Sequence, residues 1–144
     1  MKIDTLLYED GYEAIVVRHW RCESPIRPEE DVITATYSIL RDGTIIAEKN
    51  YPWDFATGAF DTLTIIRGSL AHDIICQAIA EGRLDKKWQK PADRLLKRIC
   101  KLDGMARFRA WYVYRGVRAY QKRKRRILFD AHPVKSIPPD GAGL

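Results

Sequence analysis

The stretch RGSLAHDIICQAIAEG, residues 67–82, is where the predicted fold changes from sheet to helix. Apolar side chains recur in it at three- and four-residue spacing, at Leu70, Ile74, Ile75, Ala78 and Ile79. This spacing puts them on one face of an α-helix. Gly82 follows, and glycine readily adopts the left-handed backbone that ends many helices. The stretch therefore predicts a helix from about Arg67 to Glu81 with one buried face.

The residues before this helix predict an antiparallel sheet. Three segments are rich in β-branched and aromatic residues: EAIVVRHW (13–20), VITATYSIL (32–40) and TIIAEKNY (44–51). Gly43 supplies the positive φ angle for a tight hairpin turn between the last two. An opening pair, 3–7 and 12–17, completes a small meander of about four strands. The segment SPIRPEED (24–31) is predicted to be a loop, because its two prolines cannot donate to a ladder.

Two more helices are predicted after Gly82, one at about 91–102 that ends at Gly104, and one at 105–125. The third helix is amphipathic. Its apolar stripe is Ala106, Ala110, Val113, Val117 and Tyr120, and its predicted opposite face is Arg107, Arg115, Arg118, Lys122 and Arg125. The sequence predicts one α+β domain over residues 1–126, in which three helices cover the sheet. Residues 127–144, rich in proline and glycine, are predicted to be an extended or disordered tail.

Charge is divided unevenly along the 144 residues. Residues 1–64 carry 6 basic and 12 acidic side chains, whereas residues 65–144 carry 19 basic and 7 acidic ones. This polarity predicts an anionic partner for the C-terminal half, or attraction between the two halves or between copies. The three cysteines are too few and too scattered for a disulfide framework. Because there is no signal peptide pattern and no apolar run long enough to span a membrane, we expect a cytoplasmic protein.

Three polar residues form a candidate catalytic or metal-binding set, with His72 and Asp93 as the catalytic candidates and Asp73 as a metal ligand. Adjacent residues on a helix point about 100° apart, so His72 and Asp73 are expected to face different partners. If the first two helices pack antiparallel, Asp93 reaches a ring nitrogen of His72, which would then act as a general base toward water. The other interpretation is that His72 and Asp93 only join two helices. Asp54 is likewise open to two interpretations, as a cap of the turn after the last strand or as a carboxylate in the same cleft.

The basic third helix is the second candidate site. Nine basic residues and no acid lie between Met105 and Arg126. The predicted anion- or partner-binding residues are Arg107, Arg115, Arg118, Lys122, Arg123, Lys124, Arg125 and Arg126. Arginine and lysine neutralise phosphates and aromatic side chains stack on bases, so nucleic acid or anionic lipid is one predicted partner. A protein interface is the other, and no base-reading motif accompanies the patch.

Several spaced motifs resemble a family of small uncharacterised phage and prophage proteins. They are WDFATGAFDT (53–62), RGSLAHD (67–73), ADRLL (92–96) and DGMARFRAWYVYRGVR (103–118). The family signature, Asp-x-Ala-Ser/Thr, then His-Asp, then Ala-Asp, falls here on Asp54, Ala56 and Thr57, on His72 and Asp73, and on Ala92 and Asp93. The similarity covers roughly residues 44–120. It implies a phage origin, and with it a location in the host cytoplasm during infection or in the virion.

The order of His72, Asp73 and Asp93 is also similar to the phospholipase A2 layout. That resemblance implies His72 as the base that activates water, Asp93 as its support, and Asp73 as a ligand of Ca²⁺. Asp54, as the further carboxylate in the same cleft, is the second candidate metal ligand. Two positions depart from the pattern. Cys76 stands where a tyrosine usually follows, and the glycine-rich calcium loop is reduced to Gly58.

Together these observations predict a phage-encoded structural or accessory protein, a component of the virion or of its assembly, with phage proteins or other copies of itself as partners. A calcium-dependent hydrolase is the alternative, and a non-specific nucleic-acid-binding accessory protein is a further one.

Overall fold

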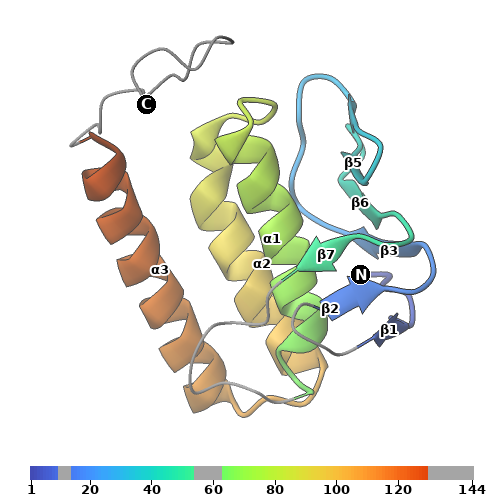
Figure 1. Cartoon of the computed structure of the whole chain (residues 1–144). Helices are drawn as coiled ribbons and strands as arrows, with labels where there is room; N and C mark the ends of the chain where they lie inside the picture. Colours follow the sequence, from blue (N-terminus) through green and yellow to red (C-terminus); the bar gives the residue numbers. More distant parts are fainter. Residues whose placement is uncertain (10–13, 54–62, 130–144) are drawn as a thin grey trace, which may run out of the picture.

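The computed structural model describes residues 1–9, 14–53 and 63–129, with side chains through residue 120. Two small antiparallel sheets are followed by helices, so the chain has the predicted α+β fold (Figure 1). The four-stranded sheet has the order β3-β6-β5-β4, with β3 (Trp20–Glu23), β4 (Val32–Ile33), β5 (Tyr37–Ile39) and β6 (Thr44–Ala47). The three-stranded sheet has the order β1-β2-β7, with β1 (Tyr8–Glu9), β2 (Ala14–Val16) and β7 (Pro52–Trp53).

The strands differ from the predicted single meander because the chain leaves one sheet for the other at two places. The predicted strand 13–20 is divided into β2 and β3 by residues 17–19. The chain turns again after β6 at Asn50, which has a positive φ of 73°. The backbone of Val16 in β2 makes two hydrogen bonds to this second turn. Its carbonyl accepts from the Asn50 N–H at 2.7 Å, and its N–H donates to the Tyr51 carbonyl at 3.0 Å. These bonds place β7 next to β2.

The glycines predicted at the hairpin turn and at the ends of the helices have the positive φ angles that these positions require. Gly43 has φ of +93° in the β5–β6 hairpin, and Thr44 N–H donates to Asp42 Oδ1 at 2.9 Å beside it. Helix α1 (Ile66–Ala80) ends before Gly82, whose φ is +73°. Helix α2 (Gln89–Leu102) follows the short 3-10 helix η1 (Lys86–Trp88) and ends before Gly104, whose φ is +98°.

The molecule is built in three layers, in which the sheets pack on α1 and α2, and α3 (Arg107–Phe129) packs on α2 (Figure 1). The main core lies between the sheets and α1, and includes Trp20, Tyr37, Ile39, Ile45, Leu70, Ile74 and Ile75. A second core between α2 and α3 holds Ile65, Leu96, Cys100, Met105, Ala110 and Val113. The prediction that all three helices cover the sheet was wrong for α3, whose small apolar stripe faces α2.

The apolar stripe predicted on α3 is confirmed at its centre, where Ala110 and Val113 are buried, while Tyr120 is 62% exposed. The helix continues to Phe129, past the predicted end at Arg125 and into the start of the predicted tail. Residues 130–144 lie outside the described part. Within the described residues, no helix combines the length and the apolar character needed to cross a membrane.

Close packing of α1 on α2 depends on Gly68. A Cβ atom built at this position would lie 2.9 Å from Leu96 Cδ1 and 3.2 Å from both Cys100 Sγ and the Leu96 carbonyl oxygen. Real Cβ contacts are rarely so short, and so only glycine lets the two helices approach this closely. Their contact in turn places His72 of α1 against Asp93 of α2.

Candidate functional site

The predicted pairing of His72 with Asp93 is present in the structure. His72 Nε2 and Asp93 Oδ1 are 2.6 Å apart, in a contact between α1 and α2. Both residues are buried, His72 with 8% and Asp93 with 0% of its surface exposed. The adjacent Asp73 does not join them, as the 100° rotation per residue predicted.

Asp93 has two further donors, which sequence reasoning did not assign to it. Gln89 Nε2 donates to Asp93 Oδ1 at 3.1 Å, and Arg118 Nη1 donates to Oδ2 at 2.9 Å. Arg118 was predicted on the outer face of α3, and this was wrong. It borders the apolar stripe at Val117, so its long side chain reaches inward past that stripe to the buried carboxylate. The cluster His72–Asp93–Arg118 therefore joins all three helices.

These contacts keep both members of the His72–Asp93 pair charged. Burial works to raise the pKa of Asp93, but its hydrogen bonds with His72, Arg118 and Gln89 outweigh burial and lower it. Burial works to lower the pKa of His72, but hydrogen bonds with Asp93 and Cys76 outweigh burial and raise it to about 10. His72 is thus an imidazolium at neutral pH. An imidazolium has no lone pair on nitrogen with which to accept a proton, whereas a general base must accept one.

Cys76 is a further neighbour of this cluster that sequence reasoning did not place there. Its Sγ lies 3.7 Å from each ring nitrogen of His72 and 3.3 Å from Gln89 Nε2. The signal was present in the spacing, since Cys76 is four residues after His72 on α1, and Gln89 is four residues before Asp93 on α2. The cluster is thus assembled from two i,i+4 pairs that face each other.

Asp73 lies on another side of α1, toward the sheets. Burial, and next the Asp73 carboxylate, raise the pKa of Tyr51. The Tyr51 hydroxyl donates to Gln77 Oε1 at 2.6 Å, one helical turn from Asp73. Asp54, the other predicted calcium ligand, lies outside the described residues. Among those described, there is no group of three His, Cys, Asp or Glu side chains suited to a metal ion, and the calcium site stays a prediction.

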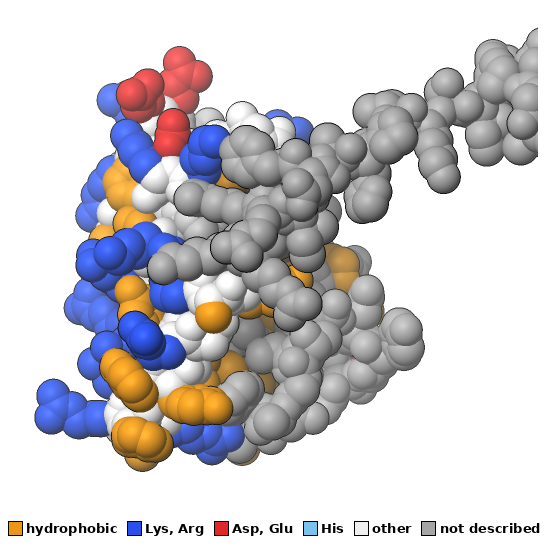
Figure 2. Space-filling view, turned by 90° about the vertical axis from the view of Figure 1, so that its left-hand side faces the viewer, with side chains coloured by type: hydrophobic (Ala, Val, Ile, Leu, Met, Phe, Trp, Pro, Cys, Tyr) orange, Lys and Arg blue, Asp and Glu red, His pale blue; other side chains and the backbone are white. Residues whose placement is uncertain are grey.

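The second candidate site is the outer face of α3, which we define as Arg107, Phe108, Trp111, Tyr112 and Arg115. All five side chains are exposed, with Phe108 at 76%, Tyr112 at 57% and Trp111 at 46%. The Phe108 and Trp111 ring centroids are 6.0 Å apart, and the Arg115 guanidinium lies 5.8 Å from the Trp111 ring. Figure 2 views this side of the molecule, where lysine and arginine side chains surround hydrophobic ones, and the acidic side chains in view lie at the upper end.

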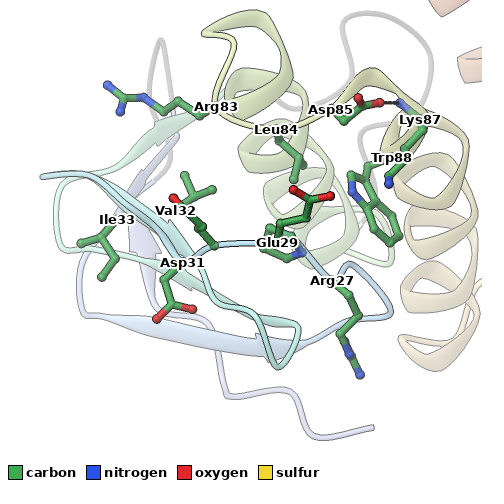
Figure 3. Close-up of a pocket in the computed structure, with 12 residues that line it drawn as sticks. Arg27, Glu29, Asp31, Val32, Ile33, Arg83, Leu84, Asp85, Lys87 and Trp88 are labelled. Atoms are coloured by element: carbon green, nitrogen blue, oxygen red, sulfur yellow. Dashed lines mark hydrogen bonds between the residues drawn. The ribbon is translucent and has the colours of Figure 1, made fainter.

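A pocket of about 440 Å³ opens elsewhere, between residues 27–33 and residues 83–88 (Figure 3). Its apolar lining includes Leu84, Val32 and the Trp88 ring, with Glu29 between Leu84 and Trp88. The Lys87 ammonium lies 5.5 Å from the Trp88 ring centroid. Arginine, lysine and acidic side chains all line the pocket, and it contains none of the predicted site residues.

Comparison with protein-family models, with curated proteins and with solved structures found no match for this chain.

Proposed function

We propose that the chain is a structural or accessory protein of a phage, which docks into an assembly through the outer face of α3. The observation that carries this proposal is the exposure of Phe108, Trp111 and Tyr112 beside Arg107 and Arg115 on one helix face. Tryptophan, tyrosine and arginine are the side chains that contribute most to binding at protein interfaces. Single exposed apolar residues are normal, but three large exposed rings within two helical turns are typical of an interaction surface.

The internal cluster supports the same proposal. The carboxylate of Asp93 is buried, and both of its oxygens accept bonds from cationic side chains, Oδ1 from His72 and Oδ2 from Arg118. The Arg118 bond connects α3 to the α1–α2 pair, and so it holds the outer face in a fixed orientation on the molecule. We infer that the His72–Asp93 pair orients the docking helix rather than a substrate. The motifs that resemble phage proteins suggest the kind of assembly.

Incorporation into phage particles tests the docking role. Particles made by a phage carrying this gene are purified, and the protein is quantified in them by mass spectrometry. The double replacement Phe108→Ser and Trp111→Ser should remove it from the particles. Ile33→Ser is the matched control, because Ile33 on β4 is 69% exposed and lines the pocket between residues 27–33 and 83–88, which includes no residue of α3. Full incorporation of the double variant, or absence of the wild-type protein from particles and a strictly monomeric state, contradicts the proposal.

A hydrolase that uses His72 and Asp93 is the second candidate, and the 2.6 Å bond between them favours it. Its chemistry requires a neutral His72 open to substrate, with Asp73 and Asp54 as candidate ligands of Ca²⁺. Purified protein incubated with phospholipid vesicles and Ca²⁺ tests it. Fatty acid release that disappears in His72→Gln supports a hydrolase. No release at any pH between about 6 and 10, the upper end of which reaches the pKa of His72, rejects it.

A further inference from the structure

The sequence of helix α3 carries charge of a single sign. Helix α3 contains nine basic residues and no acid in its sequence from Arg107 to Phe129. Arg118 is the one of these that the structure pairs with Asp93, inside the molecule. The neighbouring helix α2 has one acid, Asp93, and Asp103 just after it is bonded to Arg67. No acid of α2 or α3 is therefore left to neutralise the exposed arginines.

A nucleic acid matches the charge of this helix better than an acidic protein does. At about 1.5 Å per residue, a helix of 23 residues is roughly 34 Å long. A folded protein rarely presents only negative charge over that length, because protein surfaces mix the two signs. A polynucleotide presents a negative charge at every phosphate, with no positive charge between them.

The aromatic side chains indicate a single strand rather than a duplex. Phe108, Trp111 and Tyr112 are exposed on the same face as Arg107 and Arg115. The planes of Phe108 and Trp111 are tilted by only 33°, so the two rings form neighbouring platforms. Unpaired bases stack on such rings, whereas the bases of a duplex are already stacked on each other.

We propose that the partner of the outer face of α3 is single-stranded nucleic acid, whose phosphates contact Arg107 and Arg115 and whose bases stack on Phe108, Trp111 and Tyr112. This inference rests on the docking role proposed above, and it names the partner for that face. Recognition is independent of sequence, since stacking and charge neutralisation do not distinguish the bases. Arg118 takes no part, because Asp93 holds its guanidinium inside the molecule.

Fluorescence anisotropy of a labelled oligo-dT of about 16 nucleotides tests the inference, a length within the range that single-strand-binding modules cover. Full-length protein should bind it more tightly than the same length of duplex. Trp111→Ala should weaken binding on the order of ten-fold, since a stacked base contributes about 1–3 kcal/mol. Ile33→Ala, which removes an exposed apolar side chain from β4, should bind like wild type.

The salt dependence of the same affinity tests the phosphate contacts. Each contact to a single strand contributes about −0.7 to the slope of log affinity against log salt, so Arg115→Gln should make the slope less negative by about 0.7. The matched control is Arg41→Gln, an exposed arginine in the β5–β6 turn, which should leave the slope unchanged. Circular dichroism spectra like that of wild type show that these surface variants are folded.

Three results overturn the inference: no binding of oligo-dT at low salt, equal binding of single strand and duplex with no effect of Trp111→Ala, or binding only of vesicles that contain anionic lipid. The assay of incorporation into phage particles distinguishes failure of this inference from failure of the proposed function. If the Phe108 and Trp111 variant is missing from particles while the wild type does not bind oligo-dT, the docking role stands and its partner is a protein. If oligo-dT binds but the variant is incorporated normally, the docking role fails.

Discussion

Replacing Asp93 by asparagine changes the charge of the buried cluster without changing its size. The carboxylate offers both of its oxygens as acceptors, one to His72 and Gln89 and the other to Arg118. An amide offers one oxygen, so its NH₂ group must face a donor, either the imidazolium or the guanidinium. Removing one partner of a buried ion pair typically costs about 3–5 kcal/mol. A domain of this size has about 5–15 kcal/mol of stability in total, and therefore Asp93→Asn should lose a large share of it.

The loss should depend on pH, because neutral His72 can accept a hydrogen bond from the new amide. We expect the largest destabilisation near pH 6, where the wild type has the full stability of the charged pair. A smaller one is expected near pH 9, where the wild type has lost most of that stability because His72 is neutral in the unfolded chain. Urea unfolding followed by circular dichroism measures both values. Asp103→Asn is the matched control, since Asp103 bonds to Arg67 and to no histidine, and its cost should be similar at the two pH values. A loss in Asp93→Asn below about 1 kcal/mol near pH 6, or the same loss at both pH values, refutes the reasoning.

Three other outcomes are expected, each measured by urea unfolding. The folded-state pKa of His72 is raised from 6.5 to about 10, so the stability that His72 contributes is complete below pH 6.5 and should be lost as pH rises toward 10. The free energy of unfolding should fall by at most about 1.4 kcal/mol per pH unit in this range, and this dependence on pH should be absent in His72→Gln. Gly68→Ala should cost about 1–3 kcal/mol, because the new Cβ meets Leu96. Gly116→Ala on α3 is the control and should be neutral or stabilising, because nothing lies within 4 Å of its Cβ. Equal effects of the two would show that α1 and α2 do not pack closely at Gly68. Tyr51→Phe should cost about 1 kcal/mol for the lost bond to Gln77, and an unchanged stability would mean that this bond contributes nothing.

Local signals in the sequence predicted the helical part of the fold well. Gly43, Gly82 and Gly104 all have the positive φ that their positions after a turn or a helix require. The apolar spacing of α1 and α2 identified the buried faces, since it depends only on 3.6 residues per turn. The division into two sheets was not predictable in the same way. It depends on Asn50 adopting a positive φ and on long-range pairing of β2 with β7, and neither is recorded in the periodicity of any one segment.

One contact of the candidate site was predicted from the sequence, and another was not. The His72–Asp93 contact followed from two facing helices, and the structure contains it. Arg118 was assigned to the outer face because helical periodicity gives the direction of Cβ and not the end of a long side chain. The inward turn of its guanidinium depends on the buried charge of Asp93, which a one-dimensional pattern of polar and apolar residues does not express.

Measuring the charge state of His72 tests most directly whether the His72–Asp93–Arg118 cluster is a structural element or a catalytic one. An NMR titration of the imidazole carbon-bound protons in full-length protein measures it. We predict that the His72 resonances do not shift between about pH 5 and pH 8, because Asp93 keeps the ring protonated. A titration midpoint near pH 6.5, in protein that is folded throughout, would contradict the account and make His72 available as a general base.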